Sequence, residues 1–389
     1  MLTPAQQQLQ VAFNRQIEWC TQLGSPFMVR LLAVSRDLLI TDAALAEQFL
    51  TLVPDPGPGL VALRFTGALH ALALQGHEPW ASLWPSTAPA GSQATDAALI
   101  QAVHLAVTSQ WLHIKNTLRS APQTNEVRRS AVLLPGWLHV AKQTGLPLAL
   151  VEIGASAGLN LWADKWLHDH GTWTWPGDRE VRITSEWRGP PPVGLTQPST
   201  QPSTQPPTLH IASRRACDIL PIDITQAAQR QRLASYVWPD QTERLQLLDA
   251  ALSKAASWAS LSGLKIEAVD AASYLQRELH TLPAGQTTLV FHSIVWQYLS
   301  GPERQRLQAV ITAAGARATA TSPLAWLSYE FSAADQPAQL RCRIWPSVQP
   351  RVETSAPPST QPDGDEQLLA HAHPHGAWVE WVAGSPGLQ

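Results

Sequence analysis

The sequence predicts an α/β protein in which a helical N-terminal domain, residues 1–146, precedes a domain of alternating strands and helices, residues 147–389. Two observations carry this prediction. The first 145 residues hold apolar side chains at helical spacing between turn signals, and no strand pattern there is comparably strong. From Leu146 onward, short apolar runs alternate with helical segments, which is typical of a parallel sheet with crossover helices.

In the N-terminal domain, each predicted helix starts at a capping signal or ends at a turn signal. Thr3-Pro4 and Ser25-Pro26 supply an N-cap followed by a proline in the first turn, and Gly145 closes the last helix. The expected helices span residues 4–23, 27–39, 42–52, 60–76, 96–118 and 125–144.

The second domain is expected to contain seven strands. They span residues 148–153, 181–187, 264–269, 288–291, 324–329, 340–345 and 376–382. The expected helices between them span residues 157–168, 225–237, 240–258, 271–279 and 302–314. Because no helix separates the last two strands, they are expected to form an antiparallel pair at the end of the sheet.

Composition excludes several classes of function. The chain holds 27 Lys+Arg and 30 Asp+Glu, a net charge of -3 without long runs of one sign, which argues against binding nucleic acid or an acidic membrane. Three scattered cysteines, Cys20, Cys217 and Cys342, fit a reducing, cytoplasmic setting. No apolar stretch of about 20 residues and no signal-peptide pattern is seen. The expected partner is therefore a small molecule or another acceptor, with oligomeric state left open.

Two segments are low in complexity. Residues 196–208 repeat TQPS, and the same letters return at residues 359–362. Such Pro/Ser/Thr/Gln tracts bury too little apolar surface to offset the entropy of ordering. We expect mobile surface inserts near residues 190–208 and 354–365.

The segment LALVEIGASAGLNLWAD, residues 148–164, is the most informative for function. In class I methyltransferases, an acid on the first strand and a glycine-rich turn accommodate S-adenosylmethionine; Glu152, Gly154 and Gly158 match, while Ser156 replaces the middle glycine and Asn160 follows. In α/β-hydrolases, G-x-S-x-G forms a nucleophile elbow with Ser156 as the nucleophile. A third interpretation is a tight turn that needs small residues for packing.

Sequence context favours the methyltransferase interpretation. A hydrolase elbow normally follows several earlier strands, whereas about 145 largely helical residues precede this one. Asp270 and His375 could complete a hydrolase triad, but His375 precedes a strand of the terminal pair. That pair matches the Rossmann-like seven-strand methyltransferase sheet, so we expect this fold type.

Roles follow from positions at strand ends, where ligands bind in open α/β sheets. Glu152 is expected near the methionine end of the cofactor. Glu186, ending the second predicted strand, is the candidate for the ribose hydroxyls, or an exposed loop acid. Asp270 is the candidate for the adenine amino group, or the N-cap of the next helix.

The acceptor side is assigned in the same way. His292 and Ser293 end the fourth strand, and His292 is the candidate general base. Tyr298 is a second catalytic candidate, and Trp296 is expected on a substrate lip or in the core. Gln123, Asn125 and Glu126 are expected to orient cofactor or substrate, although Asn125 could simply cap a helix.

A metal site is the weaker alternative. His371, His373 and His375 alternate along the chain, and His168 and His170 add two imidazoles. Pro374 interrupts the first group, and no H-E-x-x-H or C-x-x-C spacing is found. No metal is therefore expected.

Five segments of the chain carry a family resemblance. They are PQTNEVRRSAVLLPG (122–136), VEIGASAGLNLWAD (151–164), YVWPDQTERL (236–245), VFHSIVWQYL (290–299) and PHGAWVEW (374–381). In these the chain resembles the bacterial family named domain of unknown function 2332, over nearly its whole length. The resemblance implies no substrate. From the turn and the predicted sheet, we expect methyl transfer from S-adenosylmethionine to an unidentified acceptor. The alternatives are a serine hydrolase and a non-catalytic ligand- or partner-binding protein.

Overall fold

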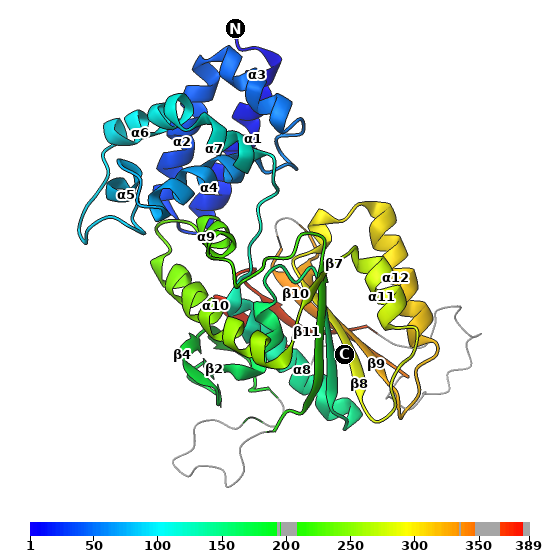
Figure 1. The fold of residues 1–389 in the computed structure, drawn as a ribbon. Helices are drawn as coiled ribbons and strands as arrows, with labels where there is room; N and C mark the ends of the chain where they lie inside the picture. The colour runs from blue at the N-terminus through cyan, green and yellow to red at the C-terminus, as the bar shows by residue number, and fades with distance from the viewer. Residues whose placement is uncertain (193–194, 196–207, 334–335, 347–365, 384–389) are drawn as a thin grey trace. The chain divides into compact units, whose positions relative to one another are not determined.

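The structure is a computed structural model that describes residues 1–192, 195, 208–333, 336–346 and 366–383 (Figure 1). The chain divides into two compact units. Unit 1 comprises Met1–Thr124 and Asp223–Asp249, and unit 2 comprises Asn125–Ile222 and Ala250–Gln389. The predicted domain bounds, 1–146 and 147–389, differ from this division in two segments, because residues 125–146 group with the sheet and residues 223–249 with the helices.

Unit 1 is helical. Its helices are α1 (Pro4–Gln22), α2 (Pro26–Thr41), α3 (Ala43–Leu52), α4 (Val61–Leu74), α5 (Trp80–Leu83), α6 (Asp96–Ser109), α7 (Trp111–Leu118) and α9 (Ala227–Ser235). Thr3 and Gln6 form the capping box that starts α1. One helix was predicted for residues 96–118, and the structure has two, because Gln110 leaves helical geometry at φ -117° and ψ 24°.

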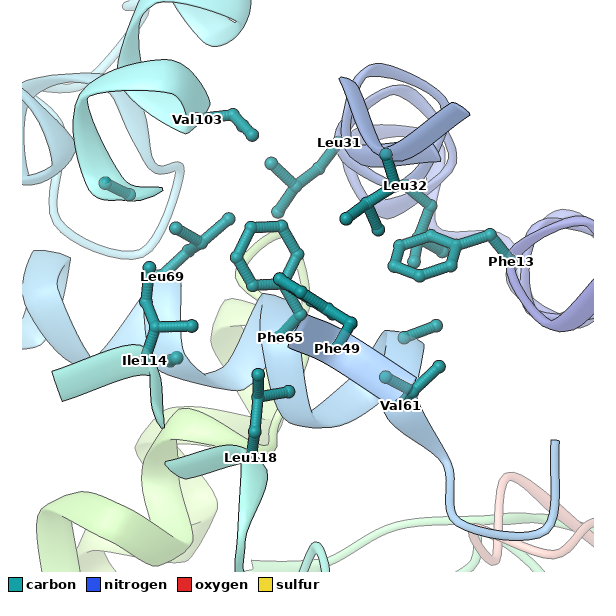
Figure 2. Packing of buried hydrophobic residues seen from close by; sticks show 14 of the residues in the cluster. Phe13, Leu31, Leu32, Phe49, Val61, Phe65, Leu69, Val103, Ile114 and Leu118 are labelled. Atoms are coloured by element: carbon teal, nitrogen blue, oxygen red, sulfur yellow. The ribbon is translucent and has the colours of Figure 1, made fainter. Parts of the chain in front are cut away.

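The core of unit 1 forms around α4. Phe65 of α4 is fully buried and lies edge-on to Phe49 of α3, with ring centroids 5.1 Å apart. Leucine and valine side chains of α2, α6 and α7 surround these rings (Figure 2). The apolar side chains that indicated these helices in the sequence thus form the core of unit 1.

Unit 2 contains a nine-stranded, mostly parallel sheet in the order β5-β12-β11-β10-β9-β8-β1-β6-β7. Its strands are β1 (Leu148–Ile153), β5 (Glu186–Arg188), β6 (Ile211–Asp218), β7 (Ile266–Ala268), β8 (Thr287–Ser293), β9 (Leu324–Phe331), β10 (Ala338–Trp345), β11 (Gln367–Ala372) and β12 (Trp378–Trp381). A second sheet has the order β3-β2-β4, formed by β2 (Trp166–Asp169), β3 (Thr174–Trp175) and β4 (Asp178–Ile183).

Helices cover both faces of the large sheet (Figure 1). The helices of this unit are α8 (Ser130–Thr144), α11 (Ala271–Glu278) and α12 (Gly301–Gly315), and α10 (Thr242–Ser262) contains the division between the units. Val151 and Ile153 of β1 share a core with α11 and α12. On the other face, Phe291 of β8 packs against Trp137 of α8, with ring centroids 5.3 Å apart. Since both faces are covered, β1 and β8 are buried along their whole length.

The second strand of the parallel region is not the one predicted. Residues 181–187 were expected beside β1, but they divide between β4 in the small sheet and β5 at the far edge of the large sheet. The strand that pairs with β1 is β6, IASRRACD, in which Arg214 and Arg215 form ion pairs with Asp164 and Glu278. Its charged residues conceal the apolar pattern that sequence analysis uses to find a buried strand.

Two further predictions were wrong. The helix expected at 157–168 is a 3-10 helix, η2 (Leu159–Lys165), followed directly by β2. The terminal pair expected at 340–345 and 376–382 does not exist as a pair, because β11 lies between β10 and β12 and all three are antiparallel. The large sheet thus has nine strands, and the seven-strand arrangement is not confirmed.

No helix in the described ranges is long and apolar enough to cross a membrane. The predicted inserts, apart from their margins, lie outside the described residues and stay a prediction.

Candidate ligand site at the carboxyl edge of the sheet

The large sheet has a topological switch point beside β1. Strands β6 and β7 follow β1 on one side, whereas β8 and β9 lie on its other side, and all five are parallel. Crossover connections leave in opposite directions at such a point, which opens a crevice outside the carboxyl ends of the strands. The turn that follows β1, residues 154–158, lies at this edge.

Left-handed backbone explains the small residues of this turn. Gly154, Ser156 and Gly158 have φ values of 65°, 53° and 69°. A Cβ atom on Gly154 would lie 2.5 Å from Val295 Cγ2, and one on Gly158 would lie 2.9 Å from Ile266 Cδ1. Local conformation and packing therefore require both glycines, whatever the ligand.

The N–H groups of the turn bond to protein acceptors. Ala155 donates to the carbonyl of Cys217 at 3.1 Å, and Ser156 donates to Asp218 Oδ2 at 2.8 Å. Leu159 donates to Asn125 Oδ1 at 2.9 Å. The expected α-helix after the turn, whose first N–H groups could have faced a ligand, is the 3-10 helix η2, and the N–H of Leu159 at its start is taken by Asn125. The turn does not offer the cradle of N–H groups that binds phosphate in dinucleotide sites.

Two buried oxygens at the turn have no hydrogen-bond partner among the described residues: Glu152 Oε2 and Ser156 Oγ. Glu152 is 2 % exposed and Ser156 is 7 % exposed. Burial raises the pKa of Glu152 well above its usual value, Asp218 raises it further, and Arg129 partly offsets both. The protonated form of Glu152 is therefore favoured relative to that of an ordinary glutamate, and in that form the carboxyl can donate as well as accept a hydrogen bond.

Asp218 is a site residue that the sequence analysis missed. It ends β6 one position beyond the pairing of Cys217 with Ile153, so it lies beside the turn after β1. Its carboxylate accepts N–H bonds from Ser156 and from Leu220, each at 2.8 Å. The buried Ala216 and Cys217 just before this acid were a weak signal of a strand end.

Arg129 is the second missed residue. It ends the 3-10 helix η1 (Val127–Arg129) and is 9 % exposed. Its guanidinium donates to the carbonyl of Ser293 at the end of β8 and to that of Pro374, both at 3.0 Å. A buried cation thus lies at the carboxyl edge, and its interruption of an apolar helical pattern was the available signal.

The Gln123 to Glu126 segment does not act as one group. Gln123 belongs to unit 1, and Asn125 and Glu126 belong to unit 2. Asn125 holds the start of η2, and Glu126 caps η1 by accepting from the N–H of Arg128 at 3.3 Å. Asn160 is 1 % exposed and lies 3.5 Å from Ser130 Oγ. Asn125 therefore contacts the chain directly after the turn, whereas Glu126 acts on η1.

Of the predicted adenosine contacts, Glu186 is far from β1 in the sheet order. It lies on β5, at the opposite edge from β6, and pairs with Arg188 at 2.9 Å. Asp270 follows β7 and caps α11, accepting from the N–H of Ser273 at 2.9 Å. The capping interpretation of Asp270 is confirmed, and hydrogen bonds from Ser273 lower the pKa of its carboxyl.

The predicted acceptor side does not contain a free imidazole. His292 is fully buried, and both of its ring nitrogens are within hydrogen-bond distance of protein groups. Trp296 is half-buried and stacks on His292, with ring centroids 4.8 Å apart and planes 6° apart. Tyr298 is 57 % exposed at the end of the 3-10 helix η3 (Trp296–Tyr298).

Metal binding finds no support in the described part of the chain, where no group of three or more His, Cys, Asp and Glu side chains could hold an ion. His168 and His170 are buried among tryptophans, and burial lowers their pKa values to about 3 and about 4. Both imidazoles are therefore neutral near neutral pH.

Unit 1 contains a small cavity of its own. Its volume is about 30 Å³, and it lies beside His70 and Tyr236. His70 makes contacts at 3.1 Å to the carbonyl of Ser235 and at 2.9 Å to Ser86 Oγ. The volume admits about one water molecule, so this cavity is not a substrate site.

Fold and site together define a two-unit α/β protein with a polar, partly buried edge at the switch point of its main sheet. The chain belongs to a family described as an uncharacterized protein conserved in bacteria (DUF2332), whose family model matches residues 10–381. Searches of curated proteins and of solved structures found no match.

Proposed function

We propose that unit 2 binds S-adenosylmethionine at the carboxyl edge of β1 and β6 and transfers its methyl group to an acceptor. The observation that carries this proposal is the pair of buried oxygens without described partners, Glu152 Oε2 and Ser156 Oγ, beside the carboxylate of Asp218. Buried polar atoms without partners are rare in folded proteins, and a ligand is one way to satisfy them. They lie where open α/β sheets bind ligands.

The residues at this edge fit the cofactor better than they fit a dinucleotide. The N–H groups of Ala155, Ser156 and Leu159 are engaged by protein acceptors, which suits a ligand without phosphate. Asp218 would accept the ribose hydroxyls, since each carboxylate oxygen can accept more than one hydrogen bond. Glu152 and Ser156 would bind near the methionine end, and Asp270 near the adenine amino group. When bound, the cofactor supplies an electrophilic methyl group on a positively charged sulfur.

Calorimetry with S-adenosylhomocysteine, the demethylated product, tests the proposal. We expect the wild-type protein to bind it and Asp218→Asn to weaken binding about 10- to 100-fold, because a hydrogen bond to a charged group contributes about 1.5–3 kcal/mol. Glu186→Gln is the matched control, since Glu186 lies at the opposite edge of the sheet, and its affinity should equal that of the wild type.

Three outcomes decide the matter. A folded wild type without measurable affinity contradicts the proposal. A loss of affinity in Glu186→Gln instead of Asp218→Asn shifts the site to the other edge. Binding without turnover of any acceptor favours a non-catalytic ligand-binding protein.

A second candidate function is a serine hydrolase, and the conformation of Ser156 favours it. A nucleophile elbow holds its serine on a sharp, strained turn after a strand, and Ser156 follows β1 with φ 53°. Against it, Ser156 Oγ makes no hydrogen bond with any described residue, histidines included. An activated serine needs a base within hydrogen-bond reach.

We expect the wild-type protein not to react with serine-directed fluorophosphonate probes, a result that would count against the hydrolase. The physical reason is that an unassisted hydroxyl at 7 % exposure is a weak and poorly accessible nucleophile. Labelling is measured by mass spectrometry, with Ser156→Ala as the control. Modification of Ser156 in the wild type alone would replace methyl transfer by hydrolysis as the preferred function.

The cellular setting is part of the same proposal. Cys20, Cys217 and Cys342 are free and buried. Burial raises the pKa values of these thiols to about 11, about 12 and about 12, which keeps them protonated. Reduced, unreactive cysteines suit a cytoplasmic protein with a small-molecule or other acceptor as its partner.

A further inference from the structure

Glu330, which no sequence pattern singled out, organises the end of β8. It lies on β9 and is 8 % exposed. Its Oε1 atom is 2.7 Å from His292 Nδ1 and accepts the N–H of Val295 at 2.8 Å, and its Oε2 atom accepts the N–H of Trp296 at 3.2 Å. One buried carboxylate thus accepts two backbone N–H groups just beyond the end of β8, those of Val295 and Trp296.

The protonation of His292 follows from its neighbours. Trp326 donates its indole N–H to His292 Nε2 at 3.1 Å, and an indole nitrogen can only donate. His292 Nε2 must therefore carry a lone pair, and its proton lies on Nδ1, where it is donated to Glu330. The ring is neutral and both nitrogens are occupied, so His292 acts on Glu330 and not on a substrate.

The segment held by this carboxylate is strained. Ile294 has a φ of 55°, a left-handed conformation that a β-branched residue rarely adopts. Its own N–H bonds to the carbonyl of Tyr329 at 2.8 Å. Such strain persists only where the surroundings over-determine it, and it is concentrated at functional sites.

The strained segment connects the carboxylate to the turn after β1. Val295 fills the space beside Gly154, where a Cβ atom would lie 2.5 Å from its Cγ2. Trp296 stacks on His292, and Tyr298, two residues further on, is exposed. The segment 294–298 therefore has one side against the candidate cofactor turn and ends in an exposed aromatic ring.

We infer that Glu330, oriented by His292, is a positioning residue that holds segment 294–298 as a wall of the ligand site and presents Tyr298 to the bound ligand. This inference rests on the proposed binding of S-adenosylmethionine at the turn after β1. It assigns His292 a supporting role in place of the general base that its position suggested.

Glu330→Gln tests the inference, because the amide retains one acceptor and places an NH₂ group where a second acceptor is needed. We expect hydrogen exchange at the amides of Val295 and Trp296 to become at least tenfold faster, with Val151 of β1 as an unchanged internal reference. We expect the Kd for S-adenosylhomocysteine to rise about tenfold. Glu303→Gln is the matched control, since Glu303 also accepts a backbone N–H, that of Ser300, at an exposed helix start.

Two milder variants keep the test valid if Glu330→Gln fails to fold. Trp326→Phe removes the indole N–H donor to His292 but keeps an aromatic ring in the core, and we expect hydrogen exchange at Val295 and Trp296 to become about threefold faster. Tyr298→Ala leaves the hydrogen bonds of Glu330 intact, so exchange at Val295 and Trp296 should stay within twofold while the Kd rises about fivefold.

Each measurement can contradict a different part of the inference. Unchanged exchange at Val295 and Trp296 in Glu330→Gln overturns the role of the carboxylate. Faster exchange with an unchanged Kd shows that the segment is not part of the site. A wild-type protein that does not bind S-adenosylhomocysteine overturns the proposed function, and with it the role of segment 294–298 as a wall of the ligand site. In that case hydrogen exchange at Val295 and Trp296 still shows whether Glu330 holds the segment.

Discussion

Replacing Glu152 with glutamine is expected to make the protein more stable at neutral pH, although the substitution is at a fully buried position. Burial and the neighbouring Asp218 raise the pKa of Glu152 in the folded state. In the unfolded chain the same carboxyl ionises near its ordinary value of 4.5. Glutamine has nearly the same shape as the protonated acid but never ionises.

The sign follows from proton linkage. Above pH 4.5 the unfolded chain loses the proton while the folded protein keeps it, so folding must take up a proton. Wild-type stability therefore falls, by about 1.4 kcal/mol per pH unit, as pH rises from the unfolded pKa toward the folded one. Glu152→Gln lacks this loss, and its advantage should be near zero below pH 4 and grow as pH increases.

Urea unfolding between pH 4 and pH 8 measures the effect. Glu380→Gln serves as the control, because Glu380 is also a strand residue but is exposed, and it should show no such trend. A variant that is less stable than the wild type at every pH would show that the protonated carboxyl is well satisfied inside unit 2. A gain would mark Glu152 as a residue retained at a cost in stability, which is typical of a binding site.

The second large effect is expected for Gly154→Ala. Gly154 has φ 65°, and an added Cβ atom would lie 2.5 Å from Val295 Cγ2. Left-handed backbone costs a residue with a Cβ atom about 1–2 kcal/mol, and overpacking costs about 1–3 kcal/mol. The free energy of unfolding should therefore fall by about 2–5 kcal/mol.

Gly145 provides a control that separates the two causes. It ends α8 with φ 68°, almost the same conformation, but no atom lies within 4 Å of an added Cβ. Gly145→Ala should lose only the backbone contribution, about 1–2 kcal/mol. Equal losses in the two variants, measured by urea unfolding, would mean that Val295 moves aside and does not press on the turn after β1.

Substitution of Gly158 does not separate ligand binding from folding, as the sequence interpretation had assumed. From sequence, a long side chain at Gly158 would block a ligand without disturbing the core. The structure gives Gly158 a φ of 69° and places Ile266 and Leu161 against the position that an added Cβ atom would take. Substitution there strains the fold, so loss of binding in such a variant would not identify a ligand contact.

Local sequence was sufficient where the pattern and the environment agree. The helices of unit 1 have apolar residues at helical spacing that pack around Phe65, and β1 and β8 are apolar runs buried on both faces. The same holds for Glu152 near the end of β1 and for Gly154, Ser156 and Gly158 in the turn that follows it, which all lie within seven residues of one another. Residues close together in sequence keep their proximity in any fold, so a motif can identify them.

The sequence by itself determined the helical N-terminal region, the parallel strands β1, β7, β8 and β9, the family and the turn after β1. Only the tertiary structure decided which acid lies beside that turn, because β6 is stabilised by ion pairs of Arg214 and Arg215 and lacks an apolar pattern. It also decided the role of His292, whose two nitrogens are occupied by Trp326 and Glu330, residues 34 and 38 positions away. Hydrogen bonds between distant residues depend on strand order and register, and these are set by packing over the whole sheet rather than by local propensity.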